Sequence, residues 1–239
     1  MKNAQLPLLF LIFFHVSAVQ AQTKHYNSGD SIFVWASSLN MRETPDPKSP
    51  VKKKIPYGSV LLIIGDSIGE VAYKHLAVPS RNMSDGNKSK PFYLSGFWVK
   101  VSYEGVVGYV FDGYLSKMPT LAKYIGNVED LKNWAKKDLK LTAYPYKKGD
   151  NAWITYSSQT SGVEVKIGHN EKSSFREIRL QDISMQEALM LGIQIFEADY
   201  LIVIDKDHYE FKSLIAEGDC SIYISNVKGK IVISLSCHC

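Results

Sequence analysis

Hydrophobic and polar residues alternate in short runs through the first half of the chain. Two short apolar runs, 55–64 and 98–101, are bounded by turn residues, as is typical of β-strands. Alternation near the second run predicts two faces, with Trp98, Lys100 and Tyr103 on one and Val99 and Val101 on the other. Short strands of this kind, separated by turns, predict a small β-barrel.

The second half mixes helical and strand patterns. Apolar residues recur at helical spacing from Val128 to Leu139, behind the N-cap candidate Asn127, and from Met185 to Phe196, behind Ser184. The second of these helices is apolar on nearly all sides, so we expect it to be buried. Strand patterns cover residues 153–156, 163–167, 200–204, 208–214, 221–225 and 231–235. This order predicts an α+β domain with a mainly antiparallel sheet. Together with the small barrel in the first half, the chain as a whole is predicted to be mainly β.

Four short motifs stand in the first half in an order that a known family shares. They are Leu-Asn-Met-Arg with a Pro-rich loop (39–50), Tyr-Gly before a long apolar strand (57–64), a strand that starts with Trp (98–101), and Gly-Tyr-Val followed by Tyr-Leu (108–115). The stretch resembles a bacterial SH3 (SH3b) domain, which we place at about residues 28–117. The resemblance implies an SH3-like barrel that binds short peptides. We recognise no family in residues 120–239.

One connection in this region departs from the family. Residues 66–97 join two strands that most SH3b domains connect with a few residues. This insertion contains an apolar-rich stretch, 70–78, and a polar stretch, 82–90. We expect an extended hairpin with a mobile tip, which either contacts a ligand or is a surface excursion without a role.

The first residues have the features of a signal peptide. Lys2 precedes an apolar run at 6–16, and Val19 to Ala21 has the form of a cleavage site. We therefore predict a leader at 1–21, cleavage after Ala21, and export to the periplasm or beyond the cell. No later run reaches the roughly 18 to 20 apolar residues that a membrane-spanning helix needs. The 239 residues leave room for two domains after the leader.

All three cysteines, Cys220, Cys237 and Cys239, lie in the last 20 residues. The C-terminal strand patterns predict a hairpin in which Ile224 faces Ile233. The same register places Cys220 opposite Cys237. An oxidising compartment favours a disulfide between these two cysteines, and Cys239 is not part of this predicted pair.

Charge and motifs exclude several functions. A net charge of +4 is too small to indicate a nucleic-acid partner. The basic run 52–54 is interpreted as a solvated strand edge.

Residues 219–221 are similar to the nucleophile motif of NlpC/P60 cell-wall peptidases, but Ile222 replaces a glycine and the cysteine begins a strand. The segments 205–210 and 237–239 lack the spacing of calcium or zinc sites. We predict no catalytic residue, no cofactor and no metal.

Two classes of function stay open. The first is an exported, non-catalytic protein of the bacterial envelope, whose barrel recognises a peptide or peptidoglycan stem through aromatic rings. The residues expected to bind this ligand are Tyr57, Trp98, Tyr109 and Tyr114. The second class is a cell-wall-related enzyme with an unrecognised site in 120–239. An envelope inhibitor or immunity protein, with 66–97 as its contact loop and an envelope protein as its partner, is a further alternative.

Overall fold

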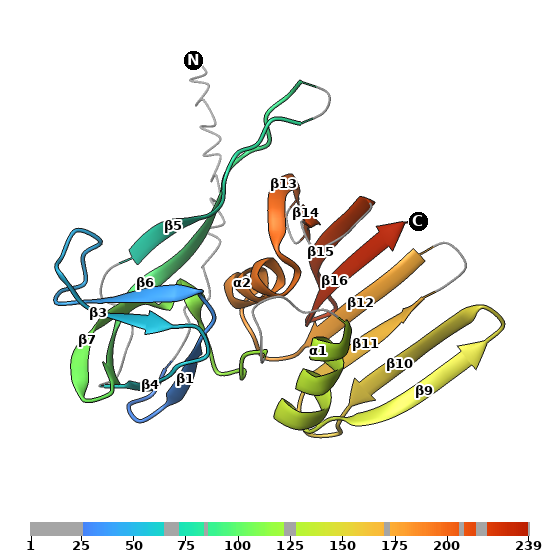
Figure 1. Ribbon diagram of the computed structural model, residues 1–239, viewed down its shortest axis with the longest axis horizontal. Helices are drawn as coiled ribbons and strands as arrows, with labels where there is room; N and C mark the ends of the chain where they lie inside the picture. Colours follow the sequence, from blue (N-terminus) through green and yellow to red (C-terminus); the bar gives the residue numbers. More distant parts are fainter. Residues whose placement is uncertain are drawn as a thin grey trace, which may run out of the picture.

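The computed structural model of the protein is shown in Figure 1. It describes residues 26–64, 72–83, 86–121, 128–169, 173–205, 208–213 and 219–238. The leader predicted at 1–21, the N-cap candidate Asn127 and Cys239 lie outside these ranges. None of the described helices has the length and apolar character needed to cross a membrane.

The fold is mainly β and contains two eight-stranded sheets, which confirms the predicted fold class. In the first sheet, neighbouring strands follow the order β3-β2-β7-β6-β4-β1-β8, and β5 pairs with β6. Its strands are β1 (Ser31–Val34), β2 (Ser38–Arg42), β3 (Val51–Pro56), β4 (Val60–Ile63), β5 (Ala72–Val78), β6 (Phe92–Tyr103), β7 (Val106–Phe111) and β8 (Leu115–Ser116). The helical turn η1 (Asp112–Tyr114) joins β7 to β8.

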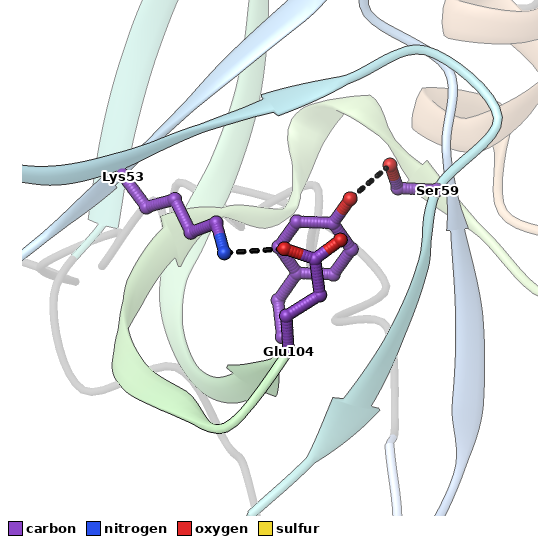
Figure 2. Close-up of polar contacts among 4 residues, drawn as sticks. Lys53, Ser59 and Glu104 are labelled. Atoms are coloured by element: carbon purple, nitrogen blue, oxygen red, sulfur yellow. Dashed lines mark hydrogen bonds and ion pairs between the residues drawn. The ribbon is translucent and has the colours of Figure 1, made fainter.

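The first sheet encloses its own hydrophobic core. Val99 and Val101 are buried in it, as the alternation predicts. The prediction for Tyr103 is wrong, because its ring packs against the same core. Residues 99, 101 and 103 are two apart and share one face of the strand. The hydroxyl of Ser59 donates to that of Tyr103 at 3.2 Å (Figure 2).

The basic run lies on β3, an edge strand, as predicted, and two of its lysines bind the β6–β7 hairpin. The Lys53 ammonium is 2.5 Å from a carboxylate oxygen of Glu104 (Figure 2), and Lys52 donates to the carbonyl of Val107 at 2.6 Å. The hydrogen bond and charge of Lys53 lower the pKa of Glu104. Glu104 and Gly105 both have positive φ angles, as a tight two-residue hairpin turn requires.

The insertion forms the expected extended hairpin. Strand β5 pairs antiparallel with the first half of β6, from Ala72 opposite Phe97 to Val78 opposite Phe92. The second half of β6 pairs with β7, so one long strand belongs to both the insertion and the barrel. Near the tip, Ser89 is buried and its hydroxyl accepts the N–H of Arg81 at 2.8 Å.

The second sheet has the strand order β13-β14-β15-β16-β12-β11-β10-β9, and all its pairings are antiparallel. Its strands are β9 (Thr142–Lys148), β10 (Asn151–Ser157), β11 (Val163–His169), β12 (Ser173–Leu180), β13 (Ala198–Asp205), β14 (His208–Ser213), β15 (Asp219–Val227) and β16 (Lys230–His238). Strands β9 and β12 are additions to the sequence prediction.

Both predicted helices are present. Helix α1 (Val128–Asn133) continues as the π-helical turn η2 (Trp134–Asp138). Helix α2 (Met185–Phe196) begins at Ser184, whose hydroxyl accepts the N–H of Glu187 at 3.1 Å. Eight of its residues are buried, which confirms the expectation for this helix. Gly192 lets α2 approach the sheet closely, because a Cβ at this position would lie 2.5 Å from Ile224.

The barrel and the second sheet share one hydrophobic cluster. The rings of Trp35 and Trp134 meet edge to face at 6.3 Å, and the insertion packs Phe92 against Phe211 at 5.3 Å. The indole N–H groups of Trp35 and Trp134 donate to the carbonyls of Met118 and Pro119. Helix α2 lies where the barrel meets the second sheet (Figure 1). The chain segment after β8 is therefore packed on both sides.

The C-terminal hairpin has the predicted register and disulfide. Ile224 lies opposite Ile233, and Cys220 is bonded to Cys237. Reduction is expected to lower the free energy of unfolding by roughly 3 kcal/mol, because the bond restricts the unfolded chain. Urea unfolding with and without reductant measures this loss, and the double variant Cys220→Ala/Cys237→Ala should match the reduced protein. A reductant that leaves the urea midpoint unchanged would contradict the prediction.

Candidate ligand-binding cleft

A cleft of about 190 Å³ lies on the outside of the barrel, between β2 and the insertion. One wall is polar and comes from β2 and the loop after it. The other is aromatic and comes from β5, β6, β7 and η1. The lining residues are Ser38, Leu39, Asn40, Arg42, Pro47, Tyr73, His75, Trp98, Phe111 and Tyr114.

The polar wall follows from the alternation of strand β2. Leu39 and Met41 are buried in the barrel core, whereas Ser38, Asn40 and Arg42 are more exposed. Side chains two residues apart on a strand point to the same face. The three polar side chains therefore form a row along the cleft.

The loop that follows β2 is held by its own hydrogen bonds. The guanidinium Nη1 of Arg42 donates to the carbonyl of Ser49 at 2.5 Å, and the Ser49 hydroxyl accepts the N–H of Thr44 at 3.0 Å. The N–H of Glu43 donates to the carbonyl of Pro50 at 3.1 Å. These hydrogen bonds join the two ends of the loop. Arg42 is therefore held in a defined position at the edge of the cleft.

The aromatic wall consists of five rings, which we call the aromatic cluster. Its members are Tyr73, His75, Trp98, Phe111 and Tyr114. Tyr73 lies 5.6 Å from Trp98 and 5.3 Å from Phe111, measured between ring centroids. His75 lies 6.2 Å from Phe111 and 5.5 Å from Tyr114. Two rings of the insertion, Tyr73 and His75, thus pack against rings of the barrel. Trp98 and Phe111 are buried by this packing.

Two glycines make room for the Phe111 ring. A Cβ at Gly113 would lie 2.2 Å from this ring, and a Cβ at Gly96 would lie 2.9 Å from it. Gly96 also brings the backbone close to Asp112, whose carboxylate accepts the N–H of Phe97 at 2.7 Å. The backbone itself forms part of the support under the aromatic wall.

The cleft has an uneven charge distribution. Arg42 is its only fully charged lining residue, and no acidic side chain is among the described residues that line it. Burial lowers the pKa of His75, which favours the neutral imidazole near pH 7. Asp112 is only 2% exposed and lies outside the lining.

The sequence-predicted binding residues occupy different places. Trp98 and Tyr114 line the cleft, so the structure brings these two together. Tyr109 is not in the lining, although it pairs with Arg42 across β2 and β7. Tyr57 lies elsewhere, 6.2 Å from Trp35 in the cluster shared by the two sheets. Tyr57 and Tyr109 therefore lie outside the lining of this cleft.

Several lining residues were missed by sequence reasoning. Tyr73 and His75 are two residues apart in the apolar-rich stretch of the insertion. This spacing was the sequence signal that their side chains lie on the same face of a strand. Asn40 and Arg42 belong to the first family motif, and they were interpreted only as indicators of the fold. Their place beside the insertion follows from pairings between distant strands.

The second half contains a polar hollow of about 270 Å³ beside β10, β11 and β12. Its charged groups are largely paired, since Arg179 lies 3.3 Å from Glu164 and 2.8 Å from Glu177. Cys220 lies on a strand and is disulfide-bonded, so it is not a thiolate nucleophile. Among the residues that the structure describes, no three His, Cys, Asp or Glu side chains are grouped to hold a metal ion.

The comparison with protein families bears on the barrel. Residues 37–116 match the family model of the bacterial SH3 domain, which confirms the resemblance seen in the sequence. The matched range contains strand β2, the whole insertion and Tyr114, and thus all lining residues of the cleft. No curated protein and no solved structure matches the chain.

Proposed function

We propose that the bacterial SH3 domain of this protein holds a short peptide segment, such as a peptidoglycan stem, in the cleft between β2 and β5. The protein is then an exported, non-catalytic binding protein of the bacterial envelope. The observation that carries this proposal is the pairing of a polar strand face with the aromatic cluster. Bacterial SH3 domains often bind peptidoglycan and are often envelope-associated, which supports the same assignment.

The dimensions and chemistry of the cleft suit one or two peptide residues. Its volume of about 190 Å³ is below the range of about 300 to 1,000 Å³ that is usual for drug-sized ligands. The rings of Tyr73 and Tyr114 are rigid and amphipathic, so they lose little conformational entropy when a ligand binds. Ser38 and Asn40 offer hydrogen-bonding groups to a peptide backbone.

One observation favours a second candidate, an envelope inhibitor or immunity protein that uses the insertion. Leu76 and Tyr93 lie directly opposite each other on the insertion and are 44% and 47% exposed. They are outside the cleft lining. An exposed apolar pair of this kind suits contact with a protein partner.

Tyr73→Ala is expected to weaken the binding of soluble peptidoglycan fragments by about 1 to 3 kcal/mol, because it removes one ring of the aromatic cluster. Isothermal titration calorimetry measures the affinity, and circular dichroism checks the fold. Tyr93→Ala is the matched control, since the same ring is removed outside the cleft. Equal affinity of wild type and folded Tyr73→Ala would place binding elsewhere. Loss of an envelope-protein partner in Tyr93→Ala alone would favour the second candidate.

A further inference from the structure

The face of the barrel that contains the cleft is basic. Across the β2–β3 pairing, Lys54 lies opposite Asn40. Tyr109 lies opposite Arg42 on one side and opposite Lys100 on the other. Directly opposed residues in a sheet share a face. Arg42, which belongs to the polar row along the cleft, therefore shares this face with Lys54 and Lys100.

On the described strands of this face, no acidic side chain lies opposite these cations. The positions that share it on β2, β6 and β7 carry serine, asparagine, tyrosine, valine or an aromatic ring. Arg42 makes no ion pair with a described carboxylate. The nearest acid along the chain, Glu43, is exposed and has no ion pair with it.

Arg42 is arranged to receive an anion. Its Nη1 donates to the carbonyl of Ser49, which orients the guanidinium and leaves further N–H donors. Arg42 is half-buried on the polar wall of the cleft, where its guanidinium is less well hydrated than in open solvent. A planar carboxylate matches a guanidinium in shape and charge and would satisfy these donors.

We propose, on the basis of the function proposed above, that the cleft binds a carboxylate-bearing part of the peptide, with Arg42 as the residue that pairs with the carboxylate. Asn40 and Ser38 then lie along the neighbouring ligand backbone. Their spacing of two strand residues, about 7 Å, equals the repeat of an extended peptide. The aromatic cluster contacts the apolar part of the same ligand residue. The cleft thereby discriminates against peptides whose carboxylates are amidated.

The first experiment leaves the protein unchanged. Wild-type affinity is measured by calorimetry for soluble peptidoglycan fragments and for the same fragments after carbodiimide coupling of their carboxylates to methylamine. We expect at least about a ten-fold loss of affinity on amidation, and a loss of affinity for the unmodified fragments at high salt. Equal affinity for both fragments overturns the inference and leaves the proposed function standing. Absence of binding to the unmodified fragments overturns the proposed function, and the inference with it.

A charge-changing variant tests the same point without disturbing the Arg42 loop. Asn40→Asp keeps the side-chain shape but places a negative charge beside Arg42, so it should weaken binding of the unmodified fragments at least about ten-fold. Binding of the amidated fragments should change less. Lys147→Gln, on the exposed strand β9, alters the net charge equally and should leave both affinities unchanged. An equal effect of the two variants, or no effect of Asn40→Asp, overturns the role assigned to this cleft.

Discussion

Leu189→Ala is expected to lower the free energy of unfolding by about 2 to 5 kcal/mol. Leu189 is fully buried in the middle of α2, within the cluster that the barrel and the second sheet share. Removal of its side chain leaves a cavity that a helix packed on several sides cannot easily close. Urea denaturation followed by circular dichroism measures the loss.

Leu62→Ala is the matched control for this prediction. It is the same substitution on strand β4, where the side chain is 47% exposed, and it should cost under about 1 kcal/mol. A similar loss in the two variants would show that burial of α2 is not the cause. A loss below about 1 kcal/mol for Leu189→Ala would place this helix at the surface.

Local signals in the sequence were sufficient for several parts of the fold. The long apolar stripe behind Ser184 predicted α2, because the cap and the helical period are properties of consecutive residues. The C-terminal hairpin was predictable to the residue, since a tight turn fixes the register of both strands. The disulfide between Cys220 and Cys237 followed from that register.

Other strands had no local signal. Strand β9 is exposed along its whole length, so it has no alternation of buried and exposed residues to detect. Strand β12 carries several charged residues and is ordered by pairing with β11 on one side and β16 on the other. Such strands are specified by their neighbours in the sheet more than by their own residues.

The candidate site was predictable only in part for a similar reason. Trp98 and Tyr114 belong to the family motifs, and both line the cleft. Tyr73 and His75 reach it through the pairing of β5 with β6. The insertion therefore has two effects on the candidate site. Its rings bury Trp98, and its side chains form part of one wall of the cleft. Neither effect follows from the motifs alone.

The same insertion also connects the barrel to the second sheet. Its buried residues Val78, Phe92 and Leu94 belong to the shared cluster, and Arg81 lies 2.6 Å from Asp199 of β13. Arg81 is half-exposed, so this ion pair contributes little. The apolar contacts of Phe92 with Tyr209 and Phe211, at 6.0 and 5.3 Å, are the stronger connection. These contacts connect the insertion, and with it the candidate cleft, to the second half of the chain.

Phe92→Ala is accordingly expected to cost about 3 to 5 kcal/mol, because the ring is 6% exposed and packs against two aromatic rings of β14. The loss should also separate the urea unfolding of the barrel from that of the second sheet, which two probes that report on different halves would detect as unequal midpoints. Tyr93→Ala removes a ring of similar size at the next position, where it is 47% exposed, and should cost under about 1 kcal/mol with coincident midpoints. If Phe92→Ala behaves like Tyr93→Ala, the insertion does not hold the two halves together, and the shared cluster depends on α2 and the Trp35–Trp134 contact instead.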